Sequence, residues 1–371
     1  MKKLLIASAV SALFAAPATA LAAGGASGAP TLDRVLEASG INVAGYIDAG
    51  YTRADRNLEG AGVSTRVFDS QNNSFGLNQF GLSVAKQPRQ GFGGLVNITA
   101  GRDAEMIHSS TAPSGAITDT SIFDLTQAFA QYATGPVTVV AGKYATMHST
   151  EVIWSPTNAN ISRSILFGAV PFTHTGVRGT WALNNQVSLI GGLNNGWDQL
   201  TDANKGKTVE LGATLNPIRP LAISVSAMNG KEPVGAGDGT RTSVNATASY
   251  SITNTLSVGG EILNVSQEVP GGTKTKYNGA AAYGSYMFTP TLRGAARVEQ
   301  FDDKNGSHFG TGPTGTKYRE VTATGAYLAA DNFEARAEVR RDQATNPVFT
   351  NTDGSPSKSL MTIAFQGIYK F

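Results

Sequence analysis

Alternation of apolar and polar residues, repeated along most of the chain, is the feature that most limits its fold. In INVAGYIDAGY (41–51), Val43, Ile47 and Tyr51 share one face, and Asp48 lies on the other. This period of two is typical of a half-buried β-strand. The same pattern recurs near 75–85, 91–101, 124–133, 137–144, 174–183, 186–194, 207–215, 221–228, 241–252, 256–264, 276–288, 292–301, 318–328, 333–342 and 359–371. The sequence therefore predicts about sixteen strands.

The lengths and connections of these segments favour a membrane barrel. Most are close to the ~9–11 residues that a tilted strand needs to cross a bilayer, and an even number suits a closed bacterial barrel. Short turns such as TGP (134–136) and NN (184–185) alternate with long polar loops. Outer-membrane barrels show this asymmetry, whereas soluble sandwiches do not require it. The predicted fold class is all-β: a transmembrane antiparallel up-and-down β-barrel formed by residues 41–371.

The start of the chain predicts export. Lys2 and Lys3 precede an apolar run, residues 4–16, which is followed by small residues. This is the pattern of a signal peptide, which we expect to span residues 1–22 with cleavage at 20–23. A membrane anchor is the weaker interpretation, because the run is shorter than the roughly 20 residues of a spanning helix.

One helix is predicted, in the N-terminal segment 23–40. In TLDRVLEASG, Leu32, Val35 and Leu36 share a face, and Gly40 stands at the position of a C-terminal cap. Everything after Gly40 reads as strands and connections.

Composition excludes several kinds of site and partner. Of 29 basic residues, two lie in the leader, and the remaining 27 balance 27 acidic ones, so nothing predicts a nucleic-acid partner. The chain has no cysteine for disulfides or thiolate metal sites. His108, His148, His174 and His308 lack the i, i+4 spacing of a zinc helix. We expect no metal and no cofactor.

Charged residues on two late strands indicate which face points inward. In the segment 292–301, Leu292 and Val298 share a face opposite Arg297. In the segment 333–342, Phe333 and Val339 share a face opposite Arg336 and its charged neighbours. An arginine facing lipid at the midplane would cost about 2–4 kcal/mol, so the charged face must line an aqueous interior. The candidate pore-lining residues are Arg293, Arg297, Glu299, Glu334, Arg336, Glu338 and Arg340.

The longest connection between predicted strands, residues 145–173, is a candidate functional loop. Loops of this length in a compact fold are usually functional or disordered. Its Trp154 and the apolar run 165–167 argue against disorder.

Four stretches resemble the OmpL-like β-barrel porins: GINVAGYIDAGYT, DLTQAFAQY, NANISRSILFGAVPFTHTGVRG and LNNGWDQLTDANKGKTVEL. The resemblance covers nearly the whole mature chain and implies a Gram-negative outer-membrane barrel with channel activity. By analogy with sixteen-stranded porins, it also implies that loop 145–173 folds inward as a constriction, with His148, Glu151 and Arg163 as polar contacts. The final strand, SLMTIAFQGIYKF, resembles the signal that the outer-membrane assembly machinery reads, and it ends at Phe371.

The predicted function is passive diffusion of small hydrophilic solutes and ions through a water-filled barrel. Because positive and negative residues are interleaved on the inward face, we expect weak ion selectivity. Outer-membrane lipids are expected partners, and a homotrimer is the assembly that analogy with porins of this size implies. A closed structural or adhesive barrel is the alternative. An outer-membrane hydrolase is less favoured, because the sequence has no G-x-S-x-G elbow, and we expect no catalytic residues.

Overall fold

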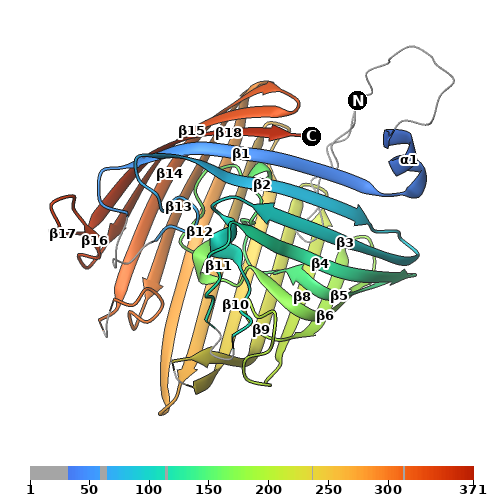
Figure 1. Cartoon of the computed structure of the whole chain (residues 1–371), viewed down its shortest axis with the longest axis horizontal. Helices are drawn as coiled ribbons and strands as arrows, with labels where there is room; N and C mark the ends of the chain where they lie inside the picture. Colours follow the sequence, from blue (N-terminus) through green and yellow to red (C-terminus); the bar gives the residue numbers. More distant parts are fainter. Residues whose placement is uncertain (1–31, 59–64, 113–115, 236, 312–313) are drawn as a thin grey trace.

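The computed structural model shows a closed barrel of sixteen strands, which confirms the predicted fold class (Figure 1). It describes residues 32–58, 65–112, 116–235, 237–311 and 314–371. The predicted signal peptide lies outside the described residues.

The barrel strands follow one another around the ring in chain order. Each pairs antiparallel with its two neighbours, and the last strand, β18, closes against β1. The barrel strands are β1 (Asn42–Ala54), β2 (Ser74–Lys86), β3 (Gly91–Ala100), β4 (Phe123–Thr134), β5 (Val137–Ala145), β6 (Thr173–Ala182), β7 (Val187–Asn194), β8 (Thr208–Ile218), β9 (Leu221–Val234), β10 (Gly237–Ser251), β11 (Leu256–Val269), β12 (Thr273–Thr289), β13 (Leu292–Asp303), β14 (Thr316–Ala330), β15 (Phe333–Ala344) and β18 (Ser359–Lys370). A separate two-stranded sheet is made by β16 (Phe349–Thr350) and β17 (Pro356–Ser357).

Two connections differ from the prediction. The alternation of short turns with long loops predicts long polar loops after the ninth and eleventh strands, at about 229–240 and 265–275. This prediction is wrong, because β9–β10 and β11–β12 continue as extended hairpins. Lys231 pairs with Thr240, and Gln267 pairs with Thr275, in the same ladders as the apolar residues below them. Polar residues can extend a ladder beyond an apolar band because pairing satisfies the backbone whatever the side chains are.

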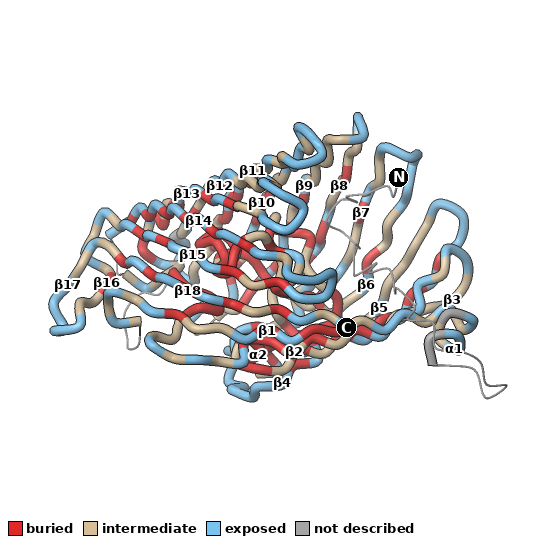
Figure 2. The backbone as a smooth tube through the Cα atoms, turned by 90° about the horizontal axis from the view of Figure 1, so that it is seen from above, coloured by how far each residue is buried: buried red, intermediate tan, exposed pale blue. Residues whose placement is uncertain are grey.

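Burial alternates residue by residue along the late strands. On β14, Glu320, Thr322 and Thr324 are buried, whereas Val321 and Ala323 between them are exposed. Figure 2 shows the same alternation of buried and exposed backbone along several neighbouring strands. The charged face therefore points into the barrel and the apolar face points out, as the sequence predicts.

The chain end completes the ring. β18 pairs with β15 on one side and β1 on the other, and Phe371 exchanges two backbone hydrogen bonds of 2.9 Å with Gly45. Phe365, Tyr369 and Phe371 are about half exposed on the outer face. The last residue is thus part of the wall, which explains why the chain ends on alternating aromatic residues.

The N-terminal helix α1 (Leu32–Ser39) lies beside the start of β1, at the edge of the barrel (Figures 1 and 2). Gly40 follows it with a φ of +67°, and the Ile41 N–H donates to the Leu36 carbonyl, which closes the helix as predicted. Among the described residues, no helix is long and apolar enough to cross a membrane.

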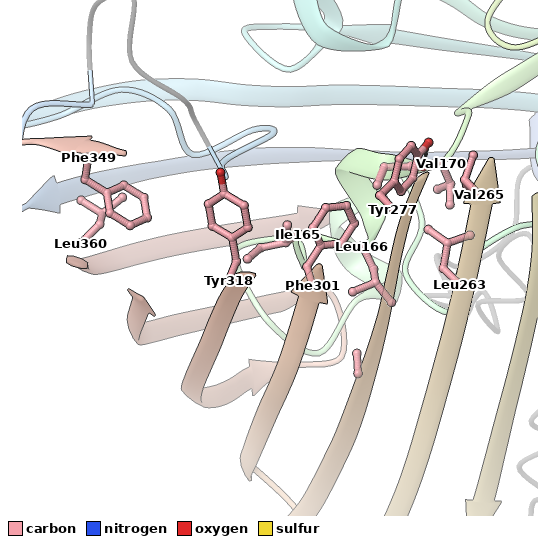
Figure 3. Close-up of a cluster of buried hydrophobic side chains, with 12 residues drawn as sticks. Ile165, Leu166, Val170, Leu263, Val265, Tyr277, Phe301, Tyr318, Phe349 and Leu360 are labelled. Carbon is pink, nitrogen blue, oxygen red and sulfur yellow. Dashed lines mark hydrogen bonds between the residues drawn. The ribbon is translucent and has the colours of Figure 1, made fainter. Parts of the chain in front are cut away.

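The apolar core lies inside the barrel, where the connection between β5 and β6 packs against the wall. We call residues 146–172 the inward loop; it includes the short helices η1 (Ser155–Thr157) and η2 (Phe167–Ala169). Figure 3 shows Ile165 and Leu166 of this loop beside Phe301 and Tyr318 of the wall. Another connection, between β3 and β4, carries the short helix α2 (Ala104–Ile107).

Gly142 on β5 offers a test of the wall packing. Its φ is +133°, and a Cβ there would lie 2.3 Å from the Ala128 carbonyl oxygen of β4. We expect Gly142→Ala to lower the free energy of unfolding by about 1–3 kcal/mol, measured by urea titration in lipid vesicles. Gly325→Ala is the matched control, because a Cβ at that strand position meets nothing within 4 Å. Equal stability of the two variants would contradict the packing described here.

Candidate functional site

The candidate site is the contact between the inward loop and the charged inner face of β13, β14 and β15. All seven candidate pore-lining residues lie on that face. Arg293 is half-buried, and the others are buried: Arg297, Glu299, Glu334, Arg336, Glu338 and Arg340. Burial of so many charges requires partners, because an unpaired buried charge costs several kcal/mol.

Carboxylates of the wall accept hydrogen bonds from backbone N–H groups of the loop. Glu338 accepts from the N–H groups of Ile161 at 2.6 Å and Ser162 at 2.9 Å. Glu299 accepts from Ile165 at 2.6 Å and from the following residue at 3.2 Å. Glu261 on β11 accepts from Thr150 at 2.9 Å. Loop N–H groups that have no secondary-structure partner are thus satisfied by negative charge from the wall.

Guanidinium groups of the wall donate to carbonyl groups of the same loop. Arg297 donates to the Ser162 carbonyl at 2.9 Å, and Arg340 donates to the Arg163 carbonyl at 2.5 Å. Arg336 makes a longer bond of 3.3 Å to the Ser155 carbonyl. Both signs of wall charge are therefore engaged by the loop backbone.

The same wall residues also form ion pairs with one another along the wall. Arg297 pairs with Glu320 of β14 at 3.0 Å, and Arg340 pairs with Asp342 at 2.9 Å. Glu334 pairs with Arg336 at 2.7 Å. Positive and negative groups are interleaved closely enough that their fields offset one another.

Two of the predicted loop residues hold the loop together. Glu151 pairs with Arg297 at 2.6 Å and accepts the Ser164 N–H at 2.7 Å. Arg163 donates to three carbonyl groups of its own loop, including those of Val152 and Ile153, at 2.8–3.0 Å. Only 1% of Arg163 is exposed, so its charge is enclosed by the loop. Its predicted role as a polar contact for solutes stays a prediction.

His148, the third predicted loop residue, lies against β9 and β10. Its Nδ1 is 2.8 Å from the Ser226 hydroxyl, and its Nε2 is 2.9 Å from the Ser243 hydroxyl. Burial lowers the pKa of His148 to about 3, which keeps the ring neutral near pH 7. A neutral imidazole suits two hydroxyl partners, since each hydroxyl can donate or accept.

The inward loop also contacts the part of the wall on the other side of the β1–β18 closure. The Trp154 indole N–H donates to Asn97 on β3 at 2.9 Å, and Gln79 on β2 donates to the Ile153 carbonyl at 3.0 Å. The Tyr46 hydroxyl of β1 donates to the Gln79 side-chain carbonyl. The loop is therefore attached to strands on both sides of the β1–β18 closure.

Sequence reasoning missed two carboxylates of this site, Glu261 and Glu320. Each lies at an inward position of a predicted strand, so the alternation of faces already indicated that its side chain points into the barrel. The histidines have ordinary partners: His108 lies 3.1 Å from Asp124, and His174 lies 3.0 Å from the Gly196 carbonyl. No three histidine or carboxylate side chains of the described residues form a group that could hold a metal ion.

Several solved structures share this barrel. The outer membrane channel DcaP of Acinetobacter baumannii has a TM-score of 0.61 and 13% identity, covering 89% of this chain and 97% of that one. An anion-selective porin from Comamonas acidovorans has a TM-score of 0.65 and 10% identity, covering 89% and 99%. OprB of Pseudomonas putida has a TM-score of 0.59 and 10% identity, covering 91% and 96%. At these identities the likeness is one of fold.

Comparison with curated protein sequences gave no match. A family model does match, over residues 40–371, and its description is beta-barrel porin-2, OmpL-like. The match spans the whole barrel, including the charged wall and the inward loop. The chain therefore belongs to the OmpL-like β-barrel porin family.

Proposed function

We propose that the protein is an outer-membrane porin through which small hydrophilic solutes and ions diffuse passively. A barrel of sixteen strands is in the size class that leaves an aqueous channel. The observation that carries the proposal is the fixed position of the inward loop. Glu338 and Glu299 accept charge-assisted hydrogen bonds from loop N–H groups, and Arg297 donates one to a loop carbonyl. A loop held to the wall in this way would narrow the interior at a fixed place and would not block it by moving at random.

The same contacts support weak ion selectivity. Selectivity in charged pores comes from rings of side chains that present one sign of charge to the solution. Here the charges of β13–β15 are neutralised in pairs or by the loop backbone. The seven wall residues remain the proposed lining of the channel, but little net charge is left among them.

The outward face supports a place in the Gram-negative outer membrane, reached by way of the predicted signal peptide. Exposed apolar residues face outward along the barrel strands and would contact lipid. The terminal strand that ends at Phe371 would be read by the assembly machinery. A trimer form is described for OmpT of Vibrio cholerae, whose barrel has a TM-score of 0.59 to this one, and a homotrimer is proposed here by analogy.

A closed structural or adhesive barrel is the second candidate. The observation that favours it is the attachment of the inward loop to β2 and β3 as well as to β13–β15. A loop bound on both sides could fill the cross-section. We propose no enzymatic activity.

Single-channel recording tests the proposal directly. The full chain, with the leader removed, is inserted into a planar bilayer under a salt gradient. We expect stable open steps and a reversal potential close to zero, because the lumen charges offset one another. Folded protein that inserts but does not conduct would support the closed barrel instead.

Glu338→Ala should loosen the constriction. The substitution leaves the N–H groups of Ile161 and Ser162 without their acceptor, at a cost of about 1–3 kcal/mol for each buried group. We expect faster amide hydrogen exchange at these two residues and a larger, noisier conductance. Glu268→Ala is the control, because that exposed carboxylate pairs with Lys274 on a hairpin. Unchanged exchange and conductance would show that the wall does not position the loop.

His148 should make the loop sensitive to acid. The folded state binds fewer protons than the unfolded state between the ordinary pKa, 6.5, and the lowered pKa, about 3. The stability gained from neutral His148 is therefore complete above pH 6.5 and is lost as the pH falls towards 3. We expect His148→Gln to reduce the change in urea midpoint between pH 7 and pH 4. An identical change in both proteins would contradict this assignment.

A further inference from the structure

The outer surface of the barrel has an apolar groove at the seam where the sheet closes. It has a volume of about 600 Å³ and crosses β15, β18, β1 and β2. Its floor contains small residues, and larger side chains stand at its sides, including Phe75, which is 86% exposed. The outward-facing residues that line it include Ala49, Tyr51, Phe75, Leu77, Ala335 and Phe365.

Four positive charges lie on the same outer face towards the long-loop end, spread over β1, β15 and β14. We call Arg53, Lys317, Arg319 and Arg341 the basic cluster; all four side chains are exposed. Within the described part of the chain, no ion pair is formed by any of them. Asp302 is the nearest acid in register, opposite Lys317, and Asp55 is engaged by the Met361 N–H and by Arg56. The charges of the three arginines are therefore not offset by a paired carboxylate.

Strand register places the basic cluster at one boundary of the apolar band. On β14, eight residues separate Tyr327 from Arg319, which is about 27 Å along the strand. The residues between them on the outer face are Val321, Ala323 and Gly325. With strands tilted by about 35–45°, this length is about 19–22 Å along the membrane normal, somewhat less than the roughly 25 Å height of the apolar band of an outer-membrane barrel. The arginines thus stand near the edge of that band, where their long side chains can extend to the lipid headgroups.

The groove and the basic cluster are adjacent. Tyr51 of the groove pairs in register with Phe365, and Arg53 lies two residues further along the same face of β1, about 6.8 Å away. Arg341 of β15 is level with Met361 and with Val321. The apolar groove therefore runs towards the basic cluster, whose side chains form no ion pairs in the described part of the chain.

We propose that this surface binds a phosphorylated lipid, with an acyl chain in the groove and the headgroup phosphate on the basic cluster. Arginine binds phosphate with charge-assisted and frequently bidentate hydrogen bonds, and basic residues at a membrane surface attract anionic lipids. The long-loop end faces the outside in outer-membrane barrels, so the lipid belongs to the outer leaflet. The inference rests on the proposed outer-membrane location and does not depend on conduction.

Native mass spectrometry of the full chain in detergent tests the proposal, with diphosphoryl lipid A as the probe. We expect the wild type to retain this lipid better than its dephosphorylated form. The double variant Arg53→Gln, Arg341→Gln should bind at least about tenfold more weakly, equivalent to about 1.4 kcal/mol. Lys231→Gln is the matched control, because Lys231 is an exposed, outward-facing cation on β9, away from the groove. It should bind like the wild type.

A second pair of variants tests the groove. Ala49→Leu would fill it from β1, whereas Ala323→Leu adds the same bulk to the outer face of β14, outside the groove. We expect only Ala49→Leu to weaken binding. Folding of each variant is checked by heat-modified migration in gel electrophoresis.

Three outcomes would overturn the inference: equal binding by the wild type and the double arginine variant, equal binding of the two lipid forms, or loss of oligomers rather than of lipid in Ala49→Leu. The last would identify the groove as an interface between copies of the chain. Conductance is recorded on the same samples. A wild type that binds lipid but does not conduct would refute the proposed diffusion channel and leave the lipid site standing.

Discussion

A β-sheet in a membrane must close its backbone hydrogen-bond ladder into a ring. A strand edge exposed to lipid would leave N–H and C=O groups without partners, at several kcal/mol for each group. Pairing between β1 and β18 removes the last edge, and the reciprocal bonds between Phe371 and Gly45 extend the ladder to the final residue. Closure also separates two environments, so that one side of every strand faces the interior and the other faces outward.

That separation explains why the interior can hold so many buried charges. Arg297, Glu299, Glu338 and Arg340 are not left to water alone; the inward loop supplies them with backbone donors and acceptors. The exchange is mutual, because a loop without regular secondary structure has backbone groups that must be satisfied somewhere. Wall and loop therefore stabilise each other, and the charges of the inner wall are largely engaged in holding the inward loop.

On the outer face, the type of residue changes along each strand with the surroundings that it meets. Small and apolar residues occupy the middle of the strands, while arginines appear where the band ends on β1, β14 and β15. Two outward positions only two residues apart on one strand can therefore lie in different surroundings, one in the apolar band and the other at its boundary. This is why the groove beside Tyr51 and the cation at Arg53 can act together.

The number of barrel strands, their faces and the inward direction of the charges follow from the amino-acid sequence alone. Alternation is a local property: once Val321 faces outward, Glu320 and Thr322 must face inward. It did not determine the extended β9–β12 hairpins, the enclosure of Arg163 by its own loop, or the partners of Glu338. The bond from Ile161 to Glu338 joins residues 177 positions apart, and only the closed ring brings them together. Contacts of that kind depend on strand register and loop path, which the tertiary structure decides because no local pattern encodes them.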